Sequence, residues 1–170
     1  MNPQNPLPEA EFQRQIESLL PRAAGYAWTV VRNRADAEDA VQEAALKACR
    51  NRRRYDPARP LKGWWLAIVR NCCFDLLRRR SRAATVPADE TTLPARETPL
   101  PGEHEDLYHA LARLSPPHRE ILELRYFGDC TYRDIAAALA IPQGTVMSRL
   151  HAARGALAAL LKEESQEEMP

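Results

Sequence analysis

Residues 131–157 read TYRDIAAALAIPQGTVMSRLHAARGAL, and this stretch decides the fold of the second half of the chain. Thr131 and Asp134 have the spacing of a capping box, which opens a short helix. The proline and glycine within Ile141-Pro142-Gln143-Gly144 predict a turn, because neither suits the middle of a helix. A second helix is predicted from Thr145, where apolar residues recur at helical spacing: Val146, Leu150, Ala153 and Leu157.

The first of these two helices carries small side chains along one side. Ile135 and Leu139 are expected to face the core, and Ala136 to Ala138 leave room for another helix to cross closely. Two short helices with matching apolar faces and a tight turn predict a helix-turn-helix. An ordinary helical hairpin is the alternative.

The outward side of the second helix has the layout of a DNA-reading helix. At about 100° per residue, its outward half carries Gly144, Met147, Ser148, His151, Ala152 and Gly155. A helix in the major groove needs short or polar groups toward the bases and a cation on each flank near phosphate. We therefore predict phosphate contacts for Arg149 and Arg154. The other predicted DNA contacts are Thr145, Met147, Ser148 and His151.

The composition limits the class of protein. The chain has 170 residues, 45% hydrophobic and 28% charged, with few aromatics, so it suits one or two helix-rich globular domains. The longest apolar run is far shorter than a membrane span, which predicts no membrane insertion. The cysteines lack zinc-ligand spacing, so packing in a reduced, cytoplasmic compartment is expected, with no metal site. These cysteines are Cys49, Cys72, Cys73 and Cys130.

The net charge of +1 hides a strongly basic block. Residues 47–82 contain 12 Lys and Arg against 2 acids, Asp56 and Asp75. Clustered arginines create a field suited to phosphate. The block therefore favours a nucleic-acid surface, with a merely solvated face as the alternative.

The first half is predicted to be a compact helical unit. Helical spacing begins at Glu9, and Pro21 interrupts or restarts that helix. Asp36 is expected to cap a helix that runs toward Arg50. A loop containing Pro57 and Pro60 precedes a helix over residues 61–80, whose apolar residues cover much of its circumference. Such a helix is expected to be buried among its neighbours.

Residues 83–103 contain four prolines and cannot sustain a helix or a core. A linker of this length indicates two domains rather than one. The predicted fold is all-α, with two small helical domains joined by a flexible linker. The predicted organisation is a disordered tail (1–8), a first domain (9–82), the linker (83–103), a second domain (104–161) and an acidic tail (162–170).

Two sets of motifs resemble bacterial sigma-70-type factors. Asp36-Ala-Glu-Asp-Ala-Val-Gln-Glu-Ala, Leu61-Lys-Gly-Trp-Trp-Leu-Ala-Ile-Val-Arg-Asn and Asp75-Leu-Leu-Arg-Arg-Arg resemble region two. Ala110-Leu-Ala-Arg-Leu-Ser-Pro-Pro-His-Arg-Glu and Gly144-Thr-Val-Met-Ser-Arg-Leu-His-Ala-Ala-Arg resemble region four. Since no space remains for a region three, the chain resembles the extracytoplasmic function (ECF) subgroup.

The resemblance implies a dissociable initiation subunit of RNA polymerase that recognises −10 and −35 promoter elements and promotes strand opening. The implied partners are the core polymerase (β′ and β subunits), promoter DNA and an anti-sigma factor, with no cofactor. In this family, an acidic helix of region two docks on a coiled coil of β′. The matching residues are Asp36, Glu38, Asp39, Gln42 and Glu43. Alternatively, these side chains only cap and solvate a helix.

The resemblance also places the −10 contacts. Residues 51–60 match the segment that captures an unstacked base, where a positive rim and an aromatic ring can offset lost stacking. Tyr55 could equally pack against the helices. The implied −10 residues are Arg52, Arg53, Arg54 and Tyr55 in this loop, Arg70 and Asn71 on the DNA-facing helix, and Arg78, Arg79 and Arg80 toward phosphate.

Four positions are compared with the family pattern. Trp64 matches the single tryptophan of the ECF pattern and Trp65 takes the usual Leu position, so both are expected to pack rather than to wedge DNA open. Met147 and Ala152 stand where Lys or Arg is frequent. Their neutrality predicts weaker −35 attraction with a smaller salt dependence, and heavier reliance on the −10 element.

Three other functions compete with a sigma factor. A stand-alone helix-turn-helix regulator would explain residues 131–161 but not the basic first half. A sigma-like decoy that binds an anti-sigma protein would keep the motifs without initiating. An enzyme acting on nucleic acid is disfavoured, because the sequence has no carboxylate cluster, nucleophile–base pattern or glycine-rich phosphate loop.

Overall fold

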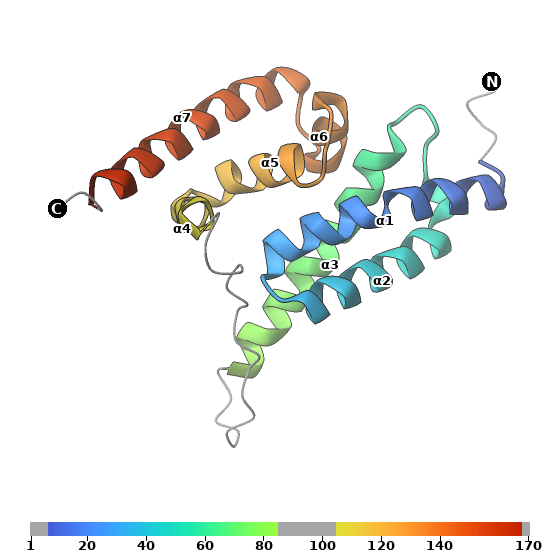
Figure 1. Cartoon of the computed structure of the whole chain (residues 1–170). Helices are drawn as coiled ribbons and strands as arrows, with labels where there is room; N and C mark the ends of the chain where they lie inside the picture. The colour runs from blue at the N-terminus through green and yellow to red at the C-terminus, as the bar shows by residue number, and fades with distance from the viewer. Residues whose placement is uncertain (1–6, 85–104, 168–170) are drawn as a thin grey trace.

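The computed structural model describes residues 7–84 and 105–167. Within them, every helix or strand element is helical, which confirms the predicted all-α class. Two helical bodies are present, and most of the predicted N-terminal tail and linker lies outside the described residues (Figure 1). The first body contains α1 (Glu9–Val31), α2 (Arg34–Arg50), a short 3-10 turn (Arg52–Arg54) and α3 (Leu61–Ala84). The second contains α4 (Glu105–Arg113), α5 (Pro116–Tyr126), α6 (Tyr132–Leu139) and α7 (Gln143–Glu167).

Helix α3 packs against α1, α2 and α6, as its broad apolar surface predicts. Trp65 and Val69 are fully buried on it. Trp64 is half-buried, with its ring 5.9 Å from that of Phe12 and 5.3 Å from that of Tyr55. The predicted packing role of both tryptophans is confirmed.

The N-cap of α2 is Asn33, so the prediction of Asp36 as the cap is wrong. Asn33 has an extended backbone, and its Oδ1 accepts a hydrogen bond from the Asp36 N–H at 3.0 Å. Because Asn33 already satisfies the helix start, Asp36 lies in the first turn. Its carboxylate pairs instead with Arg80 of α3.

Helix α1 continues through Pro21 without a break. Proline removes one backbone hydrogen bond and normally disrupts a helix interior. Here the helix buries side chains on both sides of it, Phe12 and Ile16 before it and Ala23 and Tyr26 after it. Tertiary packing therefore holds the two halves as one helix.

Two helices extend beyond their predicted ends. Helix α3 continues past its predicted end at Arg80 to Ala84, and α7 continues past Leu157, the last residue of its predicted apolar stripe, into the predicted acidic tail as far as Glu167. The added residues are mostly Arg, Ala, Lys, Glu and Gln, which have good helix propensity. Local propensity thus lengthens both helices past the last predicted apolar contact.

Helices α6 and α7 form the predicted helix-turn-helix. Both bonds of the capping box are present: Asp134 N–H donates to Thr131 Oγ1 at 3.2 Å, and Thr131 N–H donates to Asp134 Oδ2 at 2.9 Å. Ala140 ends α6 in the left-handed region with φ of 53°. Helix α7 begins two residues before Thr145. The predicted inward residues Val146, Leu150 and Ala153 are buried.

The two bodies pack directly against each other, with α6 crossing the start of α3 (Figure 1). Gly63 permits this approach: a Cβ there would lie 2.9 Å from the Ala137 Cβ and would overlap the Asp134 carbonyl oxygen. The small side of α6 predicted to admit a crossing helix is thus used by α3. We call this contact between the two bodies the seam.

Polar and aromatic contacts flank the seam. Lys62 Nζ lies 3.4 Å from Asp129 Oδ2 and also donates to the Asp129 carbonyl oxygen. Toward the other end, Trp28 of α1 and Tyr108 of α4 meet edge to face at 5.4 Å. The Arg32 guanidinium lies over both rings, 4.8 and 4.3 Å from their centroids. Such cation–π contacts add specificity to the packing.

Glu123 of α5 is buried, with 5% of its surface exposed. Burial raises the pKa of Glu123 to about 7; the Glu120 carboxylate acts in the same direction and Arg119 opposes it. Arg119 Nε lies 3.9 Å from Glu123 Oε1, too far for a strong hydrogen bond. At neutral pH this carboxyl is therefore partly protonated.

We expect Glu123→Gln to remove a pH dependence of stability. The pKa of Glu123 rises from an ordinary 4.5 to about 7 on folding, so the folded chain holds this proton more tightly than the unfolded chain. Its contribution is complete below pH 4.5 and is lost as the pH rises through about 7. Between these limits wild-type stability should fall by up to about 3 kcal/mol relative to Glu123→Gln.

Urea unfolding across this pH range measures the difference, with the exposed Glu163→Gln as control. Parallel curves for wild type and Glu123→Gln would contradict the predicted linkage.

Candidate nucleic-acid interface

One side of α3 forms an open groove of about 470 Å³. It brings together three predicted DNA contacts, Arg70, Asn71 and Arg78, with Phe74 and Leu77 between them and Ser81 beyond. The Arg70 guanidinium lies 4.9 Å from the centroid of the Phe74 ring. Cations beside an aromatic ring form the kind of groove that binds single-stranded nucleic acid.

Phe74 is a candidate contact that the sequence reasoning missed. It lies one turn after Asn71 and one turn before Arg78, so a helical wheel of α3 could have found it. Its ring is half-buried and reaches the groove.

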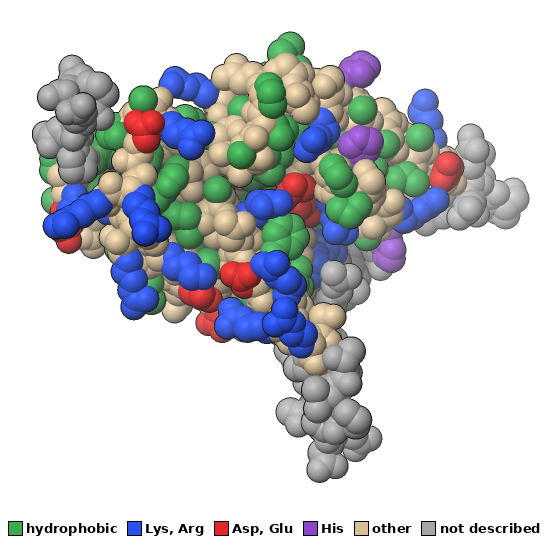
Figure 2. Space-filling view, turned by 180° about the vertical axis from the view of Figure 1, so that it is seen from behind, with side chains coloured by type: hydrophobic (Ala, Val, Ile, Leu, Met, Phe, Trp, Pro, Cys, Tyr) green, Lys and Arg blue, Asp and Glu red, His purple; other side chains and the backbone are tan. Residues whose placement is uncertain are grey.

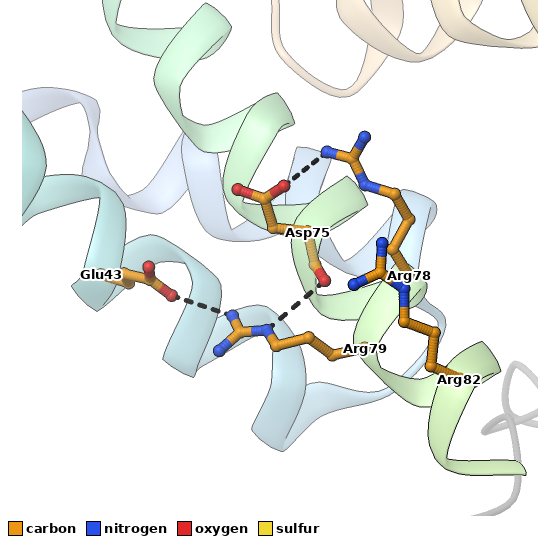
Figure 3. A pocket seen from close by; sticks show the side chains of 5 residues that line it. All are labelled: Glu43, Asp75, Arg78, Arg79 and Arg82. Atoms are coloured by element: carbon orange, nitrogen blue, oxygen red, sulfur yellow. Dashed lines mark hydrogen bonds and ion pairs between the residues drawn. The ribbon is translucent and has the colours of Figure 1, made fainter. Parts of the chain in front are cut away.

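A second pocket, of about 320 Å³, lies where α3 faces α2. Figure 3 shows Arg79 reaching Glu43 of α2, with an Nη2–Oε2 distance of 3.3 Å, and Arg78 reaching Asp75. These side chains are about half exposed, so their ion pairs are weak and exchangeable. Figure 2 shows Lys and Arg side chains gathered over the lower part of one face.

Arg80 and Asp36 form an ion pair between α3 and α2. Their side chains are 26% and 13% exposed, much less than those of Arg78 and Arg79. The pair therefore joins two helices of the first body. Neither residue lies on the open surface where the resemblance placed it.

In the loop after α2, only some of the residues predicted to contact DNA are open to solvent. Arg53 and Arg54 are exposed. Arg52 donates to the Leu7 carbonyl oxygen at 2.7 Å and lies 3.4 Å from the Glu9 carboxylate, which draws it toward α1.

Tyr55 is 7% exposed, and its hydroxyl donates to the Arg59 carbonyl oxygen at 2.8 Å. Its ring packs against Phe12 and Trp64. Of the two roles considered for Tyr55, the structure shows packing.

The outward face of α2 is acidic and open. Glu38, Asp39 and Gln42 are exposed, and Glu43 is partly exposed. A hydrogen bond from Lys47 lowers the pKa of Glu43, so this carboxylate stays ionised. Leu46 follows on the same face, three residues after Glu43, and is 59% exposed. Leu46 is therefore an exposed apolar side chain beside acidic ones.

Helix α7 presents the predicted DNA-reading face to solvent. Met147 is 57% exposed, and Ser148, His151 and Arg154 are also exposed. Arg149 is half-buried on the flank. Thr145 is half-buried, and its carbonyl oxygen accepts a hydrogen bond from Ser148 Oγ at 3.2 Å. The seam covers none of the exposed residues named here.

Cys72, Cys73 and Cys130 are buried, whereas Cys49 is exposed. Burial raises the pKa of Cys73 and of Cys130 to about 12, so both thiols stay protonated. Residues 7–84 and 105–167 hold no cluster of His, Cys, Asp and Glu suited to a metal ion. No helix in those ranges is both long and apolar enough to cross a membrane.

The family models of Sigma-70 region 2 and Sigma-70, region 4 match residues 15–83 and 104–157. The ECF RNA polymerase sigma factor SigL of Mycobacterium tuberculosis is 35% identical over 145 residues, 81% of each chain. The RNA polymerase sigma factor CarQ of Myxococcus xanthus is 33% identical over 156 residues, 89% of this chain and 90% of CarQ.

A solved structure also shares the arrangement. The sigma factor RpoE of Bartonella quintana, in complex with the anti-sigma factor NepR, aligns with a TM-score of 0.70 and 28% identity. The alignment covers 89% of this chain and 96% of RpoE, so it includes both bodies. With both sigma regions matched in order and relatives above 30% identity over most of its length, the chain belongs to the ECF group of the sigma-70 family of RNA polymerase sigma factors.

Proposed function

We propose that the outward face of α2 binds the core polymerase and that α3 and α7 divide the promoter between them. The observation that carries this proposal is the separation of charge on adjacent helices. Asp39, Gln42 and Glu43 lie on an open acidic face of α2, while Arg70 and Arg78 line an open groove on α3. One small body thus offers a surface to a basic protein partner and another to phosphate.

On the promoter, the α3 groove binds the unpaired strand of the −10 element. Arg53 and Arg54 lie on the preceding loop, and Asn71 and Phe74 supply polar and stacking contacts. Opening a duplex costs stacking energy, which cations and an aromatic ring can offset. Arg79 remains exposed enough to exchange its Glu43 partner for phosphate.

Helix α7 takes the −35 duplex. Met147, Ser148 and His151 face outward toward base edges, with Arg149 and Arg154 beside the phosphates. The charge layout does not suit a stand-alone helix-turn-helix regulator, which would need neither the α2 face nor the α3 groove. The proposed site of action is the cytoplasm, and an anti-sigma protein is a proposed partner by analogy with RpoE and NepR.

Run-off transcription with purified core polymerase on DNA upstream of this chain's own operon tests the assignment. Asp39→Ala/Gln42→Ala should abolish most initiation, because both side chains lie on the open α2 face. Glu17→Ala/Gln13→Ala is a matched control, since it also removes one carboxylate and one glutamine, here from an exposed hydrogen-bonded pair on α1. Equal activity of the two double variants would contradict the α2 assignment.

Leu46→Asp should weaken core binding by about tenfold, since an exposed leucine beside acids is a natural apolar anchor for a partner. The chain's affinity for core polymerase, measured by fluorescence anisotropy, reports this change. Leu46→Met keeps the apolar surface and should bind like wild type. If Leu46→Asp binds like Leu46→Met, then Leu46 does not contact the polymerase.

Met147→Arg/Ala152→Arg should tighten −35 binding and steepen its salt dependence, because two added cations each release about one counterion from DNA. Titrations of promoter duplex with holoenzyme at several salt concentrations measure both quantities. Ala112→Arg/Ala159→Arg adds equal charge at exposed positions elsewhere in the second body. An unchanged slope in the first variant would refute the role of these positions near phosphate.

A further inference from the structure

The seam reaches a residue proposed to bind DNA. Arg70 lines the open α3 groove and also a neighbouring cavity of about 310 Å³ between α3 and α5. In that cavity the Arg70 Nε donates to the carboxylate of Glu120. The two side chains are 31% and 15% exposed, so solvent screens this pair less than those at Arg78 and Arg79.

We propose that the seam is an autoinhibitory contact, in which the Glu120 carboxylate binds Arg70 at the position that a DNA phosphate would otherwise take. The inference rests on the proposed function of the α3 groove. Arginine binds carboxylate and phosphate with the same planar donors. A −10 strand can therefore use Arg70 only after α5 has moved away.

Arg70 differs from the other basic residues of this surface. Arg78 pairs with Asp75 and Arg79 with Glu43, both within the first body. Arg70 pairs across the seam with the second body. Of these three ion pairs, only that of Arg70 therefore couples a residue proposed to bind the −10 element to the position of the second body.

Closing the seam buries polar groups at a cost in free energy, and this cost makes it easier for the seam to open. The Tyr26 hydroxyl is fully buried beside Glu120 and Glu123 and has no hydrogen-bond partner among the described residues. Burial of the Glu123 carboxyl adds a second cost. Opening would rehydrate both groups, which offsets part of the apolar packing that is lost.

The remaining seam contacts also suit a separable joint. Lys62 and Asp129 pair near the surface, with side chains 21% and 61% exposed. Arg133 Nη2 donates to the Ala58 carbonyl oxygen at 3.1 Å. The close approach at Gly63 depends on the absence of one Cβ. A partner that prefers the open form would shift the population by mass action.

A zero-length carbodiimide crosslink tests whether the free chain is closed. The reagent joins an amine to a carboxylate as an amide with loss of water, so it can link Lys62 to Asp129 at their 3.4 Å separation. Mass spectrometry should find this crosslinked peptide in the free chain and lose it when core polymerase is added. Absence of the crosslink in the free chain would overturn the proposal.

A DNA-binding assay tests the inhibition. Its probe is a short fluorescent single strand that spans the −10 element, which the run-off experiment locates. Glu120→Arg should open the seam by repulsion from Arg70, and Gly63→Ala should open it without a change of charge. Each should tighten binding by the free chain about five- to tenfold, because a larger fraction is competent.

Two matched controls separate opening from side effects. Glu163→Arg makes the same charge change on the exposed Arg113–Glu163 pair within the second body. Gly25→Ala adds a methyl whose nearest contact is the Phe127 carbonyl oxygen at 3.9 Å, an ordinary distance. Neither control should change DNA affinity.

Equal affinity of opened variants and controls, with normal run-off activity, would overturn the autoinhibitory contact and leave the proposed function standing. No run-off from the wild-type chain with core polymerase would overturn the proposed function, and the inference with it.

Discussion

The approach of α6 to α3 at Gly63 is the contact on which the arrangement of the two bodies depends. A side chain at this position would collide with Ala137 and with the backbone at Asp134. Because the backbones meet here, α5 lies close enough to α3 for Glu120 to reach Arg70, and Glu123 is buried. The outward face of α7 stays in solvent. The seam thus covers part of the surface proposed to bind the −10 element and leaves the surface proposed to bind the −35 element open.

Ion pairs between α2 and α3 divide into structural and exchangeable ones. Asp36–Arg80 is largely shielded from solvent, so removing either partner would leave a poorly solvated charge. Glu43–Arg79 is half exposed and contributes little to stability. This difference lets α2 and α3 pack firmly while most of their outward charges remain exposed to solvent and free to meet the proposed partners.

Local features of the fold were predictable from the sequence, whereas pairings between distant segments were not. The capping box at Thr131 and the inward face of α7 follow from residues a few positions apart. The burial of Tyr55 and the Arg70–Glu120 pair depend on contacts between helices that are distant in the sequence but adjacent in the fold. No local sequence pattern specifies such contacts. The exposure of Leu46 likewise depends on which side of α2 faces its neighbours in the folded chain.

A nuclear Overhauser measurement on the free chain tests the central contact most directly. The account predicts a strong cross-peak between the Gly63 Hα protons and the Ala137 methyl group, since an ideal Cβ on Gly63 would lie only 2.9 Å from the Ala137 Cβ. Their amide resonances should also shift together when core polymerase is titrated in. A well-dispersed spectrum without this cross-peak would mean that the two bodies are apart in solution, contrary to the account.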